Sequence, residues 1–142
     1  MASSGEVPAL AVLILFCSVH LILWCAMGNF RQLAVWKRAH DLALAIYRNT
    51  GSFPDRERYG LTAQLRRAAV SLVSNIAEGS GRQSDRELAM FLRIARGSVR
   101  ELECQLLLSR DLGYLPSEAW AALDRDSQDI SRMLHGLIRS FT

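Results

Sequence analysis

The most informative stretch of this chain is Arg66-Arg67-Ala68-Ala69-Val70-Ser71-Leu72-Val73-Ser74-Asn75-Ile76-Ala77-Glu78-Gly79-Ser80-Gly81-Arg82. It starts with the apolar spacing of an amphipathic helix and ends in a Gly-Ser-Gly turn. Asn75 and Glu78 lie three residues apart, hence on one helix face. We expect them to hydrogen-bond a neighbouring helix or the turn at residues 79–82, because buried polar groups need partners. We therefore interpret four residues as a structural polar motif rather than an active site: Ser71, Asn75, Glu78 and Gly79.

Apolar residues recur at helical spacing before and after this stretch. They predict helices over residues 33–50, 59–78, 84–112 and 116–141, with Gly79 and Gly113 ending the second and third. Ser84-Asp85-Arg86-Glu87 matches a capping box at the start of the third helix. That helix then carries a heptad seam of Leu88, Leu92, Ala95, Val99, Leu102, Leu106 and Ser109. Short turns between amphipathic helices predict an all-α, antiparallel up-down-up-down four-helix bundle, with the last two helices packed together.

Composition limits the kinds of chemistry that the chain can perform. It has 142 residues, half of them hydrophobic, and a formal net charge of +3, which suits one mildly basic domain. Lys37 is the only lysine, and the arginine excess reflects either GC-rich codon usage or a preference for bidentate phosphate contacts. Its three cysteines form no C-x-x-C pair and its three histidines no H-E-x-x-H pattern. We therefore expect no metal, no cofactor and no catalytic residues.

Residues 7–30 carry no formal charge and are long enough to cross a bilayer. Arg31, Lys37 and Arg38 follow, so a membrane anchor would leave the bundle on the cytoplasmic side. Alternatively, translation starts at Met27 and residues 1–26 are an upstream extension. We favour the later start, which makes residues 1–27 a dispensable apolar extension and residues 28–142 a cytoplasmic bundle domain.

Arginines recur along one face of the third predicted helix. Arg93, Arg96 and Arg100 share this face, with Arg86 one heptad before Arg93. Like charges at these spacings cost about 0.2–0.5 kcal/mol per pair, so something should offset them. One interpretation is ion pairing with acids such as Asp85, Glu101 and Glu103 or those of the last helix. The other is a phosphate-binding stripe, which makes these four arginines candidate nucleic-acid contacts. Gly97, within the stripe, predicts a close approach by a neighbouring helix.

Several long segments resemble one known family. They are Leu33-Ala34-Val35-Trp36-Lys37-Arg38-Ala39, Phe53-Pro54, Leu61-Thr62-Ala63-Gln64-Leu65-Arg66-Arg67-Ala68-Ala69-Val70-Ser71, Asn75-Ile76-Ala77-Glu78-Gly79, Ile94-Ala95-Arg96-Gly97-Ser98 and Glu101-Leu102. In these segments the chain resembles the four-helix bundle proteins first noticed as products of intervening sequences in bacterial 23S ribosomal RNA genes. The resemblance implies a soluble bundle that assembles into a ring, expected to be a pentamer. It covers nearly everything after Met27 and carries over no catalytic residues.

Relatives of that family include the accessory protein of diversity-generating retroelements, which binds nucleic acid through a basic surface and contacts a reverse transcriptase. The resemblance and the arginine stripe together predict a non-enzymatic homo-oligomer that binds structured RNA or DNA. The alternative is a structural or adaptor oligomer that binds a protein partner such as a reverse transcriptase and no nucleic acid.

Overall fold

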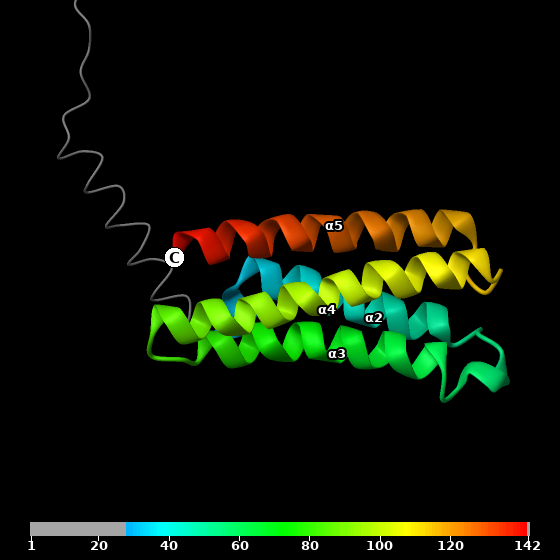
Figure 1. Ribbon diagram of the computed structural model, residues 1–142, viewed down its shortest axis with the longest axis horizontal. Coiled ribbons are helices and arrows are strands. Elements are labelled where there is room, and N and C mark those ends of the chain that lie inside the picture. Colours follow the sequence, from blue (N-terminus) through cyan, green and yellow to red (C-terminus); the bar gives the residue numbers. More distant parts are fainter. Residues whose placement is uncertain (1–27, 142) are drawn as a thin grey trace, which may run out of the picture.

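Four long helices make up the bundle in the computed structural model, which describes residues 28–141 (Figure 1). They are α2 (Ala34–Thr50), α3 (Leu61–Ser80), α4 (Asp85–Asp111) and α5 (Ser117–Ser140), with short 3₁₀ turns η1 (Phe30–Gln32) and η2 (Asp55–Glu57). Each long helix packs on the next one along the chain, and α5 returns to α2. The predicted all-α up-down-up-down bundle is confirmed, and so is the packing of the last two helices; residues 28–141 contain no strand.

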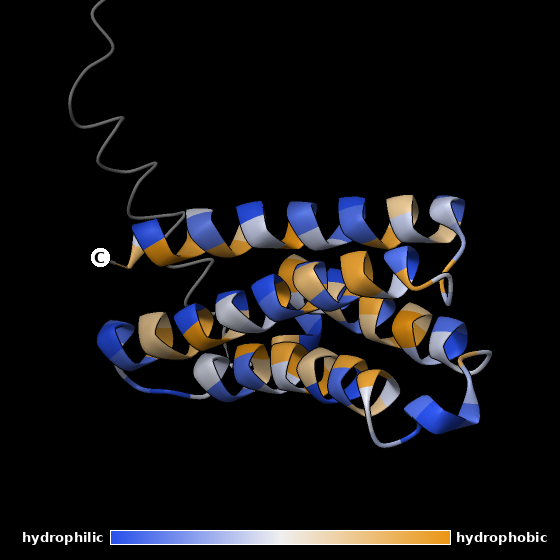
Figure 2. Cartoon of the chain, turned by 45° about the vertical axis from the view of Figure 1, so that its right-hand side comes forward, coloured by the Kyte–Doolittle hydropathy of each residue, from blue (hydrophilic) through white to orange (hydrophobic). Residues whose placement is uncertain are grey.

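Apolar faces turned toward the bundle axis form a single core, as the hydropathy colouring shows (Figure 2). All seven residues of the seam predicted for α4 are buried. In α5 the same spacing of three and four predicts a seam of Trp120, Leu123, Ser127, Ile130, Leu134, Leu137 and Phe141. Leu123, Ser127, Ile130 and Leu134 are buried, but near the end of the helix Ile138 enters the core and Leu137 is only half-buried. The spacing of three and four residues therefore placed the core correctly over most of both helices.

The apolar face of α2 is rotated slightly from the one that its sequence predicts. Trp36, Ala39, Ala43, Ile46 and Tyr47 recur at helical spacing, which predicts Tyr47 on the core face, but Tyr47 is 44% exposed. Val35 and Leu42 are buried instead, in register with Ala39 and Ile46. The guanidinium of Arg66 lies 4.9 Å from the centre of the Tyr47 ring, so this ring packs under a cation at the surface.

Both ends of α4 are fixed by local hydrogen bonds. Ser84 Oγ accepts from the backbone N–H of Glu87 at 3.3 Å, as a helix cap does. The other half of the expected capping box differs, because the Glu87 carboxylate accepts from the Ser84 hydroxyl at 2.9 Å rather than from a backbone N–H. At the far end Gly113 adopts a positive φ of 76°, and the N–H groups of Gly113 and Tyr114 donate back to Arg110 and Ser109. This is a Schellman ending, which requires a residue that tolerates the left-handed region.

Gly79 was expected to end the second helix, and this prediction is wrong. Helix α3 continues through Gly79 to Ser80, and Gly79 is buried. A Cβ atom at this position would lie 2.9 Å from the Cβ of Phe91 and 3.3 Å from Leu88 Cδ1. Gly79 therefore allows α3 and α4 to pack closely near the turn that connects them.

The predictions about the N-terminal extension, both the membrane anchor and the start at Met27, lie outside the described residues. Within residues 28–141, no helix is both long and apolar enough to cross a bilayer.

Candidate functional site

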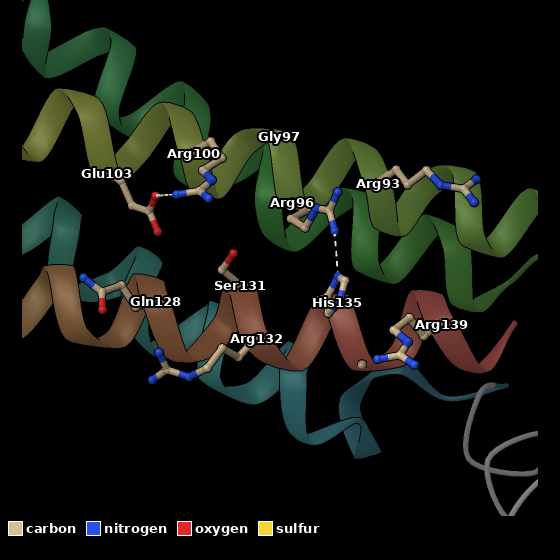
Figure 3. Close-up of a pocket in the computed structure, with 11 residues that line it drawn as sticks. Arg93, Arg96, Gly97, Arg100, Glu103, Gln128, Ser131, Arg132, His135 and Arg139 are labelled. Carbon is tan, nitrogen blue, oxygen red and sulfur yellow. Dashed lines mark hydrogen bonds and ion pairs between the residues drawn. The ribbon is translucent and has the colours of Figure 1, made fainter. Parts of the chain in front are cut away.

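A groove of about 850 Å³ runs between α4 and α5 on the bundle surface (Figure 3). Its walls carry six basic side chains: Arg93, Arg96 and Arg100 from α4 and Arg132, His135 and Arg139 from α5. Within each helix these residues are three or four apart, which places them on one face. Because the two helices are antiparallel and packed together, the two basic faces lie opposite each other across the groove.

At one end of the groove the positive charges are compensated. Arg100 Nη1 donates to Glu103 Oε2 at 2.8 Å, and the side chain of Arg100 is 76% exposed. Arg132 pairs with Asp129 one helical turn earlier. Asp129 also accepts from Arg38 of α2 at 3.1 Å. Exposed pairs of this kind contribute little to stability, but they do reduce the charge that this end offers to a ligand.

The other end of the groove keeps its positive charge. Within residues 28–141, Arg93 and Arg139 make neither an ion pair nor a side-chain hydrogen bond, and both side chains lie at the end away from Glu103 (Figure 3). Between them Arg96 Nη1 lies 3.0 Å from His135 Nδ1. A guanidinium has no acceptor, so Arg96 donates and His135 Nδ1 accepts in this contact. Two guanidiniums without an ion pair among the described residues, and one bonded only to a histidine ring, therefore lie at this end.

Two glycines in the middle of helices, Gly97 of α4 and Gly136 of α5, are among the residues that line the groove. A Cβ atom built at either position has no other atom within 4 Å. The prediction that Gly97 marks a close helix approach is therefore wrong for this chain. Gly79 fills that role, and Gly97 opens onto the groove.

Three of the four arginines predicted as nucleic-acid contacts, Arg93, Arg96 and Arg100, line the groove, and Arg86 does not. Of the acids expected to offset them, Glu103 pairs with Arg100, whereas Glu101 pairs with Arg67 of α3. The sequence reasoning did not include Arg132, His135 and Arg139 among the site residues. Their spacing in the last helix, together with the predicted packing of that helix on its predecessor, was the signal that could have found them.

The structural polar motif lies on another part of the molecule, between α3 and α4. Ser71 Oγ and Ser98 Oγ are 2.8 Å apart, so a hydroxyl pair links the two helices. Asn75 donates within its own helix to the Ser71 carbonyl at 2.8 Å, not to a neighbouring helix as expected. Glu78 forms an ion pair with Arg82 in the following turn. This arrangement satisfies polar groups beside the core and places no nucleophile next to a base.

A metal site is not formed by the residues that the structure describes, because no three His, Cys, Asp or Glu side chains gather there. The chemistry that the groove offers is therefore that of a cationic surface: charge-assisted hydrogen bonds to anionic oxygens.

Residues 31–136 match the 23S rRNA-intervening sequence protein family. The chain belongs to this family. Its fold is shared with the crystal structure of a protein of unknown function from the S23 ribosomal protein family of Bacteroides thetaiotaomicron, with 24% identity and a TM-score of 0.67. That similarity covers 74% of this chain and 98% of the other. No curated protein matches the chain. The family assignment made from the sequence segments is thus confirmed for this 23S rRNA-intervening sequence protein.

Proposed function

We propose that the groove between α4 and α5 binds the phosphate backbone of nucleic acid and that the protein is not an enzyme. The observation that carries the proposal is the uncompensated end of the groove, which Arg93 and Arg96 of α4 and Arg139 of α5 line. Arginine suits phosphate because its planar guanidinium presents several donors in a fixed geometry. An anionic oxygen is also a stronger acceptor than an imidazole nitrogen, so a phosphate would draw Arg96 away from His135.

Salt dependence tests the proposal directly, because each neutralised phosphate releases condensed counterions. We would compare the full chain with a variant in which Arg93, Arg96 and Arg139 are replaced by Gln. Loss of three phosphate contacts should reduce the log–log slope of single-stranded RNA binding against salt by about 2 per subunit bound. The measurement is fluorescence anisotropy over a salt series, with RNA and duplex DNA as probes. Binding should vary little with base sequence, since backbone contacts carry no sequence information.

The matched control replaces Arg48, Arg58 and Arg125 by Gln. These arginines are exposed and lie outside the groove. Replacing them changes the net charge by the same amount as in the groove variant. The control should keep the slope of the parent protein. If the groove variant also keeps the parental affinity and slope, the groove is not the nucleic-acid site, and the adaptor function with a protein partner such as a reverse transcriptase becomes the better proposal.

We also propose that the protein is a homo-oligomer. On α4 the side chains of Ile94 and Leu108 are 46% and 49% exposed, and Val70 of α3 is 46% exposed. Ile94 and Leu108 share the face of α4 that carries Ser98, the residue linked to α3. A second copy covering these side chains would remove them from water and repeat the groove, so that weak contacts add up on one polyanion. Light scattering should give a mass of several subunits at micromolar concentration; a monomer would refute this proposal.

A further inference from the structure

A separate pocket of about 470 Å³ lies at the end of the bundle where α2 passes into α3 (Figure 1). Its lining comes from the end of α2, from the loop at residues 51–59 and from the first turns of α3. It shares no lining residue with the groove between α4 and α5. The pocket is distinguished by hydrogen-bond donors for which the described residues supply no acceptor.

The first turn of α3 supplies backbone donors. An α-helix leaves its first N–H groups without acceptors inside the helix, and their dipoles favour a negative charge beyond the helix end. Here the Leu61 N–H donates to Glu57 Oε2 at 3.0 Å. The next two N–H groups, those of Thr62 and Ala63, have no acceptor within residues 28–141. Both of these residues line the pocket.

The hydroxyl of Thr62 is a further donor, and it indicates a ligand independently of the helix end. Thr62 is only 8% exposed, yet its hydroxyl makes no hydrogen bond within residues 28–141. The other buried serines and threonines of the described chain each donate to a carbonyl three or four residues earlier in their own helix: Thr50, Ser80, Ser98, Ser109 and Ser127. Because buried polar groups normally have a partner, the Thr62 hydroxyl is available to a molecule in the pocket.

Arg66 supplies positive charge one helical turn after Thr62, on the same face of α3. Its Nε donates to Thr50 Oγ1 at 2.9 Å, and its guanidinium lies 4.9 Å from the centre of the Tyr47 ring. These two contacts hold the side chain in place, while its Nη groups make neither a hydrogen bond nor an ion pair within residues 28–141. A guanidinium held in this way is pre-organised for an anionic oxygen, because little conformational freedom remains to be lost on binding.

We propose that this pocket binds a phosphate monoester through Thr62, Ala63 and Arg66. Asp55 and Arg58 also line the pocket, but both are exposed and their opposite charges offset each other, so the net positive charge comes from Arg66 and the end of α3. A terminal phosphate carries close to two negative charges and presents three acceptor oxygens, which suits a site with several donors around one group. The inference goes beyond the proposed function and does not rest on it, because other helices form the groove.

Backbone amide resonances of the isotope-labelled full chain test this inference, because two of the proposed contacts are themselves amides. We would titrate inorganic phosphate and adenosine monophosphate at constant ionic strength in mildly alkaline buffer and follow the resonances of Thr62 and Ala63. Both resonances should shift and saturate with either probe. Tighter binding of adenosine monophosphate would identify a nucleotide as the favoured source of the phosphate, and equal binding would show that the phosphate group alone is recognised.

Two variants remove one contact each: Thr62→Val loses the hydroxyl at nearly constant shape, and Arg66→Gln loses the charge. Hydrogen bonds to charged groups are the stronger ones, so each variant should raise the dissociation constant for inorganic phosphate about tenfold. Arg48→Gln is the matched control, since Arg48 is exposed on α2 and lies outside the pocket, and its constant should stay within about twofold of the parent. Resonances distant from the pocket would show that each variant is folded.

The inference is overturned if the resonances of Thr62 and Ala63 do not shift, or if both variants bind phosphate as tightly as Arg48→Gln does. A loss confined to Arg66→Gln would also overturn it, because the anion would then be held by charge alone and not by the buried hydroxyl. Both variants leave every residue of the groove unchanged, so these outcomes are independent of whether the groove binds RNA.

Discussion

A methyl group on Gly79 would have to fit between α3 and α4, where Phe91 Cβ is only 2.9 Å from its position. Overpacking of this kind costs about 1–3 kcal/mol, more than the roughly 1 kcal/mol that alanine gains over glycine in a helix. We therefore expect Gly79→Ala to lower the free energy of unfolding by up to about 2 kcal/mol, measured by urea denaturation. The matched control is Gly97→Ala, where the added methyl group meets open space and stability should rise by up to about 1 kcal/mol.

The same two glycines show what the sequence could and could not predict at the scale of residues. Each stands inside a polar or charged segment, and nothing in the local pattern distinguishes a glycine that allows close packing from one that opens a groove. The difference depends on what lies across from it: Phe91 and Leu88 face Gly79, whereas no atom approaches Gly97. If Gly79→Ala has the same free energy of unfolding as the parent, then α4 can shift away from the added methyl group without loss of stability.

Helix α4 is the element that the sequence predicted best. Its start is fixed by Ser84, whose Oγ accepts from the Glu87 N–H. Replacing a serine cap by alanine typically costs about 1 kcal/mol, so Ser84→Ala should lower the unfolding free energy by about that amount in chemical denaturation. Ser74→Ala is the control, because Ser74 is exposed in the interior of α3 and alanine is the better helix former there. A variant Ser84→Ala that matches Ser74→Ala in stability would show that the cap contributes nothing.

Local signals of this kind explain why some predictions about the helices succeeded. The seam of α4 and the ending at Gly113 depend only on spacing and on a backbone conformation that glycine tolerates. The rotation of α2 that exposes Tyr47 and the contribution of α5 to the groove depend on how neighbouring helices meet. Arg132 and Arg139 form part of a site only because α5 packs against α4, so the pattern of one helix could not reveal them.

At the scale of the whole molecule, the core closes entirely within the bundle. Its buried residues begin at Val35 and end at Ile138, and α5 packs back onto α2, so the first and last helices cover each other. Burial of apolar area is the main favourable term in folding, and the described residues alone form a core that joins all four helices. We therefore expect a fragment of residues 28–142 to fold without them, as a helical protein with a single cooperative thermal transition.

Circular dichroism and a thermal melt of that fragment check this expectation, with the full chain measured in parallel. The fragment should show strongly helical spectra, because the four long helices described here span most of it. Its midpoint should agree with that of the full chain within a few degrees, since a shift of about 4–8 °C corresponds to only about 1 kcal/mol in a domain of this size. An aggregated or unstructured fragment would mean that residues 1–27 cover apolar surface that the bundle leaves exposed. In that case, the half-exposed side chains of Val70, Ile94 and Leu108 would be the first candidates for a contact with residues 1–27.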